Sequence, residues 1–285
     1  MSKLLWIALV GLSWAQEEKP EPVIGTFKGT RLYNLHTTEL PAAKHLEFRV
    51  AHRFGDLRQG YANFFGIDAG ANVRLSLGYG ILPNLEIGME RTGTGKWWDA
   101  YFKFRPLRQK SPKGTPISLT WISWIFLTEQ KDEVRYPKWV YRLEYLHQLL
   151  IARKLNRWFS AMIGGALLHQ NMALTHKALN TWYWGLGGMR IKIGAHYTLI
   201  AEGAYPLWGN AFHEGEKSPL PGYRLPWSLG GEIETAGHVF QIGIASAAGL
   251  SENQLLLTQI PILTFGFNIS RMFSFFNISS NAWTR

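Results

Sequence analysis

Charged residues at alternate positions are the part of this sequence that could do chemistry. Glu47 and Arg49, Arg142 and Glu144, and Glu232 and Glu234 are each two residues apart. In a β-strand this spacing places both side chains on one face, where mixed charges could bind or pass small solutes. Fourteen such positions are expected to line one polar surface: Glu47, Arg49, Arg74, Glu86, Glu90, Lys103, Arg105, Arg142, Glu144, Arg190, Lys192, Glu202, Glu232 and Glu234.

Motifs for catalysis are not evident in the sequence. The run 91–96 resembles a phosphate-binding loop, but Glu90 replaces its first glycine and Trp97 replaces its Ser/Thr, so it predicts a hairpin turn. The nine His residues form no HExxH, there is no Cys, and no GxSxG elbow occurs. We therefore predict no catalytic residue, cofactor or metal and no enzyme, although a lipid-facing Ser–His pair stays open because such sites are defined by geometry.

The elements that position these charges show a hydrophobic period of two, which is typical of half-apolar strands. The segments run for about 9–13 residues, longer than the usual 5–6 and close to the length of a tilted strand that crosses a bilayer. About twelve are found, an even number as in single-chain bacterial outer-membrane barrels: 46–54, 71–80, 84–92, 97–105, 116–128, 139–150, 157–169, 181–193, 196–206, 225–235, 238–247 and 262–271.

The distribution of apolar residues distinguishes a membrane barrel from a soluble one. One face of the strands is continuously apolar, whereas the other carries charges of both signs. A soluble barrel would bury the apolar face, whereas a barrel in lipid exposes it and satisfies its backbone by closure. The predicted fold is an all-β, transmembrane, antiparallel up-and-down β-barrel of about twelve strands. Most of the 40 aromatic residues (Trp 13, Tyr 11, Phe 16), including those of 121–124 and 182–184, are interpreted as interfacial girdles.

The N-terminus predicts export. Residues 1–15 combine Lys3, the apolar stretch 4–12 and small residues before a cut after Ala15, the layout of a signal peptide. Residues 16–43 are expected to form a periplasmic N-terminal segment, 44–274 the barrel and 275–285 a C-terminal tail. Long connections at 55–70, 129–137, 170–180, 207–224 and 248–261 are assigned to the extracellular side; the long 106–115 and the short 92–96 break the expected asymmetry.

Composition limits the partners. The formal charge is +10, but no run of five like charges occurs, so nucleic-acid binding is not predicted. The expected partners are the lipid bilayer, lipopolysaccharide, the barrel assembly machinery, which would read the last strand ending at Phe273, and an envelope protein. The expected location is the outer membrane of a Gram-negative bacterium.

Several stretches together resemble a family of Bacteroidota β-barrel proteins known as a domain of unknown function. This resemblance implies the fold and the location but no activity or site residue, and the chain departs from the family pattern at Met89–Arg91 and past Phe273. The stretches that carry the resemblance are 26–31, 46–49, 52–55, 65–68, 78–80, 107–109, 147–154, 234–235, 237–241 and 266–271.

These observations favour an outer-membrane barrel that acts as a narrow pore or as a small-solute binding or passage protein. The alternative is a non-transporting structural or partner-docking barrel in an envelope complex, and a third class is an exported soluble β-protein. A barrel needs about 16–18 strands to leave a wide aqueous channel. Whether the charges form a selectivity filter or a polar plug is therefore left open, as are the solute and the oligomeric state.

Overall fold

The computed structural model describes residues 19–173, 178–208, 225–235, 237–258 and 262–274. The predicted signal peptide 1–15 and C-terminal tail 275–285 lie outside these ranges. Twelve strands form a closed antiparallel barrel, which confirms the predicted fold class. They are β2 (His45–Asp56), β3 (Asn72–Leu82), β4 (Leu85–Thr92), β5 (Trp97–Leu107), β7 (Ser118–Thr128), β8 (Leu143–Lys154), β9 (Phe159–Gln170), β10 (Thr181–Lys192), β11 (Tyr197–Trp208), β12 (Trp227–Thr235), β13 (His238–Ala245) and β14 (Thr264–Ser274).

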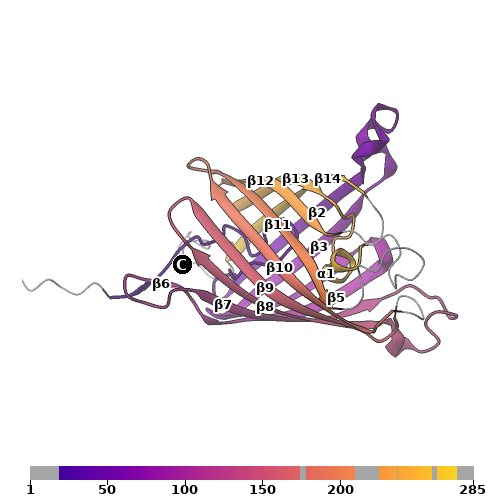
Figure 1. Ribbon diagram of the computed structural model, residues 1–285, viewed down its shortest axis with the longest axis horizontal. Coiled ribbons are helices and arrows are strands. Elements are labelled where there is room, and N and C mark those ends of the chain that lie inside the picture. The colour runs from indigo at the N-terminus through magenta and orange to yellow at the C-terminus, as the bar shows by residue number, and fades with distance from the viewer. Residues whose placement is uncertain (1–18, 174–177, 209–224, 236, 259–261, 275–285) are drawn as a thin grey trace, which may run out of the picture.

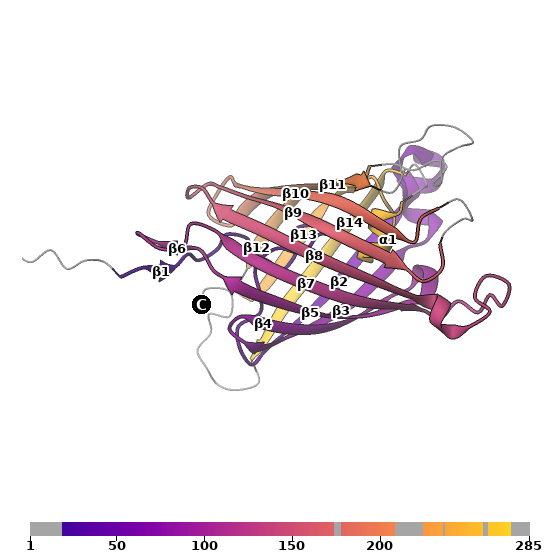
Figure 2. The ribbon, with the colours of Figure 1, turned by 60° about the horizontal axis from the view of Figure 1, so that its bottom comes forward.

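The strands are tilted, and each pairs with the next barrel strand along the chain (Figures 1 and 2). The last strand closes the ring on the first, with Arg271 opposite Phe48 and Ser270 opposite Arg49. Closure leaves no free edge, so the backbone groups of the strands are paired within the ring. The short strands β1 (Glu21–Pro22) and β6 (Lys110–Ser111) pair with each other in a separate two-stranded sheet.

The outer face is apolar, as the period of two predicts. Alternate residues of each strand remain exposed, for example Leu75 and Leu77 on β3 and Leu229 on β12. Such a band suits contact with lipid. None of the described helices is both long and apolar enough to span a membrane.

Turns and loops are divided between the two ends of the barrel (Figure 1). The end where the chain enters, called here the N-terminal end, has short turns such as 83–84 between β3 and β4. The opposite end, called the loop end, has longer connections. They include η1 (Leu57–Gln59), η2 (Tyr61–Ala69), η4 (Trp139–Arg142) and α1 (Glu252–Leu256), whereas η3 (Thr94–Lys96) forms a tight turn.

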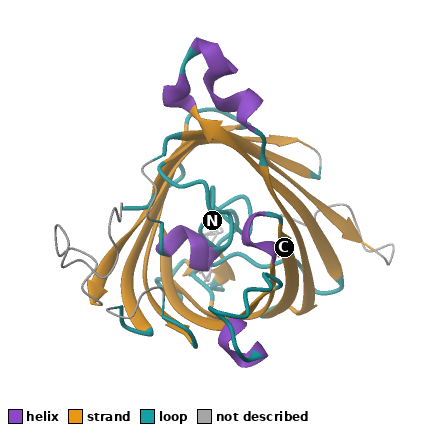
Figure 3. Ribbon diagram, turned by 90° about the vertical axis from the view of Figure 1, so that its right-hand side faces the viewer, coloured by secondary structure: helices purple, strands orange, loops and turns teal. Residues whose placement is uncertain are grey.

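The interior of the ring is filled by two inserted segments (Figure 3). One is residues 26–39 of the N-terminal segment, here called the plug segment, of which residues 30–38 are all buried. The other is the loop 246–258 with α1, here called the loop insert. The prediction that 16–43 lies in the periplasm is therefore wrong for residues 26–39, which contact the inner wall of the barrel.

Candidate functional site in the lumen

The inner wall of the barrel has two halves of different chemistry. The charged wall consists of the inward residues of β2–β5, and the apolar wall consists of those of β7–β10. In the cyclic strand order β2 and β9 are six strands apart in a ring of twelve, so the two walls face each other. The charged wall carries Glu47, Arg49, Arg53, Arg74, Glu86, Glu90, Asp99, Lys103 and Arg105, and the apolar wall carries Ile122, Trp124, Phe126, Leu146, Leu150, Met162, Ala166, Leu168, Trp182, Trp184 and Leu186, all buried.

The apolar wall differs from the expectation of a lumen lined by charges of both signs. Strands β7–β10 are apolar on both faces, so the period of two does not show which face points inward. Trp124, Trp182 and Trp184 were interpreted as girdle residues, but they are at most 2% exposed and point into the lumen. The side chain of Gln148 is also buried on this wall, and neither its oxygen nor its nitrogen has a hydrogen-bond partner.

The plug segment turns tightly across the lumen. Leu32 N donates to Leu35 O at 2.9 Å, and Arg31 pairs with His36 in an isolated antiparallel bridge. The turn projects Leu32 to the apolar wall, where a Cβ added at Gly188 would lie 2.4 Å from Leu32 Cδ1. Tyr33 projects to the charged wall, and the Arg53 guanidinium stacks on its ring at 3.8 Å.

Glu202 on β11 holds this turn by its backbone. Its carboxylate accepts the N–H groups of Tyr33, Asn34 and Leu35 at 3.2, 2.7 and 3.0 Å and the hydroxyl of Ser228 at 2.6 Å. A buried carboxylate requires such donors, because an unpaired one costs several kcal/mol. Glu202 therefore anchors the plug segment to the wall.

The remaining plug contacts come from the charged wall. Lys103 Nζ donates to Thr30 O at 3.2 Å and to Glu39 O at 2.5 Å. Arg105 Nη1 donates to Thr38 O at 3.1 Å, and Thr30 Oγ1 donates to Glu47 at 2.5 Å. The plug segment is thus held along its length by polar, non-covalent contacts to charged residues of β2 and β5.

The two inserted segments meet in a network of buried charges. Arg31 of the plug segment pairs with Glu252 of α1 and with Glu90 of β4. Arg74 of β3 pairs with Glu90, Glu252 and Asp99. All five side chains are at most 5% exposed. Three carboxylates and two guanidiniums therefore join the plug segment, the loop insert and the barrel wall at one point.

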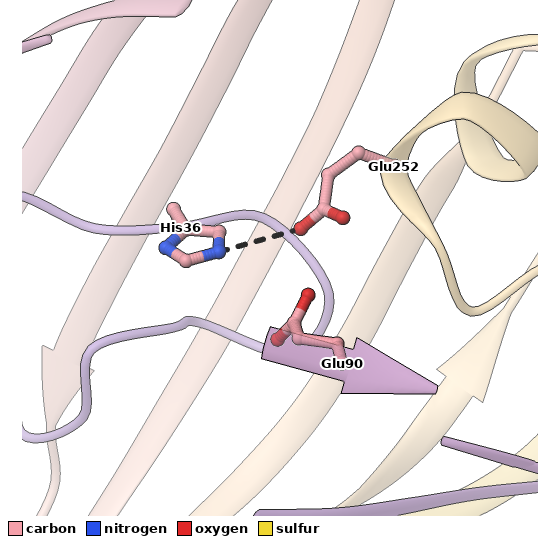
Figure 4. A group of neighbouring side chains, drawn as sticks. All are labelled: His36, Glu90 and Glu252. Atoms are coloured by element: carbon pink, nitrogen blue, oxygen red, sulfur yellow. Dashed lines mark ion pairs between the residues drawn. The ribbon is translucent and has the colours of Figure 1, made fainter. Parts of the chain in front are cut away.

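His36 lies beside this network (Figure 4). Ligand atoms of His36, Glu90 and Glu252 lie within 4.8 Å of one another, a spacing that a metal ion could bridge. Both carboxylates, however, already pair with Arg31 and Arg74, so a metal ion would have to displace guanidinium groups. His36 Nε2 lies 3.5 Å from Glu252 and neither ring nitrogen forms a hydrogen bond. We interpret the group as an ion-pair junction.

Arg49 and Arg53 differ from the other buried cations of the lumen. Neither forms an ion pair with a carboxylate of the described residues, although they are only 3% and 1% exposed. Their guanidinium groups instead donate to neutral oxygens. Arg49 Nη2 donates to Gln241 Oε1 at 3.0 Å, and Arg53 donates to Asn268 Oδ1 at 3.0 Å and to Asn34 Oδ1 at 2.8 Å.

Eleven of the fourteen predicted lumen residues are buried on the inner wall, and the other three are half-buried at the ends. Arg142 precedes β8 and lies in η4, because the chain turns in 3₁₀ conformation after Pro137. Lys192 ends β10. Glu234 pairs with Lys28 at the N-terminal end.

Several residues of the network were missing from the predicted set. Asp99 lies four residues before Lys103 on the same strand, so the period of two places it on the same face and predicts it as a lumen residue. Arg31, His36 and Glu252 lie outside the strands, where a period of two gives no signal; the run Leu255–Leu257 in a supposed external loop is the one hint that this loop is buried.

A pocket opens beside the loop insert at the loop end. Its volume is about 390 Å³. Asn253 Nδ2 of α1 donates to Glu144 on β8 at 2.8 Å, and Gln254 Nε2 donates to Thr94 O at 2.9 Å. The pocket is lined by Asn72, Trp97, Glu144, Gln170, Asn253 and Gln254, among others.

A Ser–His pair does occur on the outer face. Ser123 Oγ and His147 Nδ1 are 2.6 Å apart, and the two residues are direct partners of β7 and β8. The surrounding backbone N–H groups belong to the strand ladder, so they do not form an oxyanion hole of the kind that acyl transfer uses. We interpret the pair as two polar groups that satisfy each other on a face exposed to lipid.

Fold and lumen together define a membrane β-barrel whose interior holds its own N-terminal segment and one loop. The chain belongs to the family of the membrane bound beta barrel domain (DUF5777), whose model matches residues 27–273. The match includes residues 27–39 of the plug segment, which are thus part of the family domain.

Solved structures of outer-membrane channels are similar in fold. The COG4313 outer membrane channel from Pseudomonas putida F1 has a TM-score of 0.51 at 11% identity, over 82% of this chain and 97% of that chain. The KdgM porin has a TM-score of 0.47 at 8% identity, over 81% of this chain and 99% of that chain. The NanC porin also has a TM-score of 0.47 at 8% identity, over 80% of this chain and 98% of that chain. No curated protein matches the sequence.

Proposed function

We propose that the protein is a narrow solute channel of the Gram-negative outer membrane that is closed at rest by the plug segment. One observation carries the proposal: the plug segment occupies the lumen through non-covalent contacts, and the wall behind it carries charges that a permanently filled barrel does not need. Glu202, Lys103 and Arg105 hold this segment by its backbone. Buried charges are expensive, and apolar residues would fill a closed barrel at least as stably.

The fold similarity to an outer-membrane channel supports the class and the location. A twelve-stranded barrel becomes passable only when its contents move. The plug segment is the movable part of this lumen, because it belongs to no barrel strand and is covalently continuous with the barrel only at β2, whereas β1 before it pairs non-covalently with β6. Opening would leave a passage bounded by the charged wall and the apolar wall.

Conductance in planar bilayers tests the proposal. Wild-type protein should conduct rarely, whereas Glu202→Gln should open more often, because a neutral amide accepts the three backbone N–H groups more weakly than a carboxylate does. The matched control is Glu129→Gln at the loop end, whose side chain is 52% exposed; it should behave like wild type. If neither wild type nor Glu202→Gln conducts, although the variant is folded and inserted in the bilayer, the channel proposal is excluded.

A partner-docking barrel is the second candidate, and η2 favours it. This segment projects at the loop end (Figure 1) with Tyr61, Phe64, Phe65 and Ile67 exposed, Tyr61 at 87%. Exposed aromatic clusters of this kind mark interaction sites. If docking is the function, Phe64→Ser with Phe65→Ser should abolish co-purification of an envelope partner and leave conductance unchanged.

A further inference from the structure

One oxygen atom of the plug segment lies where three donors converge. The carbonyl oxygen of Tyr33 accepts Arg49 Nη2 at 3.0 Å, Arg53 Nη2 at 3.4 Å and Asn268 Nδ2 at 2.9 Å. Two of these donors are cationic and all three side chains are buried. Such a cradle suits an anionic oxygen better than a neutral carbonyl, because charge-assisted hydrogen bonds are about twice as strong as neutral ones.

Neither guanidinium forms an ion pair with a carboxylate of the described residues. Glu47, on the same face of β2 as Arg49, accepts the hydroxyl of Thr30. Glu202 is held by Ser228 and by the plug backbone. Glu232 accepts Gln241 Nε2 at 2.9 Å and lies 3.8 Å from Arg190. Arg53 Nε is buried without a hydrogen-bond partner, so the cradle retains an unused donor.

The apolar wall lies across the lumen from this cradle. Leu32, the residue before Tyr33, lies against Gly188 and close to Met162 on that wall. Gln148 and Trp182 of the same wall are buried with polar nitrogens that have no partner. The Leu32–Tyr33 pair of the plug segment therefore presents an apolar group to one wall and an oxygen to the cradle on the other.

From this arrangement we propose that the open lumen binds and passes small amphipathic anions. The acidic head group takes the place of Tyr33 O between Arg49, Arg53 and Asn268, and the apolar body takes the place of Leu32 on the apolar wall. The plug segment thus acts as a pseudo-ligand that competes with the solute for one site. This inference rests on the proposed channel function and specifies its substrate class.

Binding of hexanesulfonate tests the proposal, because a sulfonate keeps its charge at every working pH. Calorimetric titration of Glu202→Gln protein in lipid nanodiscs, with empty nanodiscs subtracted, should show saturable binding. Methanesulfonate, which lacks the apolar body, and hexyltrimethylammonium, which has the opposite charge, should each bind about tenfold or more weakly.

Adding Arg49→Gln and Arg53→Gln to this variant should reduce the affinity for hexanesulfonate by about tenfold or more. These two substitutions also remove plug contacts, so weaker binding cannot result from a more tightly held plug segment. Arg58→Gln, a change in the Asp56 pair at the loop end, is the matched control and should leave the affinity unchanged.

A second readout uses wild-type protein and needs no plug-releasing substitution. If anion and plug compete, hexanesulfonate should increase trypsin cleavage after Lys28 and Arg31, and hexyltrimethylammonium should not. Equal binding of the two hexyl compounds, or hexanesulfonate binding that does not depend on Arg49 and Arg53, would overturn the inference. So would the absence of both binding to the variant and added cleavage of the wild type.

Failure of the channel proposal gives a different result. Anion binding with no conductance in the plug-releasing variant would reject the channel and keep the anion site. Conductance without preference for hexanesulfonate would keep the channel and reject the anion site.

Discussion

Arg31 of the N-terminal segment and Glu252 of α1 form an ion pair in the middle of the lumen, 221 residues apart in the sequence. Each also contacts a charged residue of the barrel wall, Arg31 with Glu90 and Glu252 with Arg74. The segment that enters from the N-terminal end and the loop that enters from the other end are therefore coupled. Release of one should weaken the other, because a separated buried charge loses its partner.

Arg31→Gln is the first prediction. It removes one of the two guanidiniums that pair with three buried carboxylates. The free energy that holds the plug segment in the lumen should fall by about 3–5 kcal/mol. We expect more frequent opening in planar bilayers and faster trypsin cleavage at Lys28. Glu252→Gln should act in the same direction, and the double variant should show less than the sum of the two effects. Additive effects would show that the two segments move independently.

A second prediction uses two adjacent glycines of β10. A Cβ at Gly188 would lie 2.4 Å from Leu32 and 2.8 Å from Met162, whereas one at Gly187 meets nothing within 4 Å. Gly188→Leu should therefore displace the plug segment, which trypsin cleavage after Arg31 would report. Gly187→Leu adds the same side chain to the outer face and should leave the cleavage rate unchanged. Equal cleavage of the two variants would show that Leu32 does not occupy this place.

The third prediction concerns closure of the barrel. Strand β14 pairs with both β13 and β2, so deletion of 262–285 leaves two unpaired edges, which lipid does not tolerate. We expect the deleted chain to be absent from the outer-membrane fraction and to lose heat-modifiable migration in gels. Deletion of 275–285 alone is the control, because these residues follow β14; this shorter deletion should insert normally. Insertion of the longer deletion at wild-type levels would contradict the proposed role of β14.

The barrel could be predicted from the sequence, but its contents could not. Alternation in segments such as 262–271 separates an apolar face from a polar one. The same pattern assigned Arg49 and Glu90 to the inner wall, and both are buried there. The plug segment has no period, since it is fixed by contacts such as that of Glu202 with the backbone of Asn34.

The inward face could not be predicted for strands that are apolar on both faces. In β7 both Trp121 and Trp124 are aromatic, yet the first is 43% exposed and the second 2%. Alternation cannot assign such residues to lipid or lumen. The apolar wall therefore became visible only with the register of the closed barrel.

The last prediction follows from His36, which lies in the plug segment, outside the membrane-spanning strands. Burial lowers its pKa well below the ordinary value of 6.5, and the nearby Arg31, Lys103 and Arg74 lower it further. The carboxylate of Glu252, 3.5 Å from His36 Nε2, is already paired with two guanidiniums. Released into water, the imidazole regains a pKa of about 6.5.

With the plug segment docked in the lumen, His36 therefore binds fewer protons below about pH 6.5 than it does with the segment released into water. Docking is fully favourable above this pH and weakens as the pH falls toward the lowered pKa of the docked imidazole, by up to about 1.4 kcal/mol per pH unit. Trypsin works poorly in acid, so the measurement is the closed fraction in planar bilayers between pH 7.5 and 5. The fraction should fall for wild type and change less for His36→Phe, which keeps an aromatic ring beside Tyr101 and Trp124. The same pH dependence in both proteins would show that another group controls release.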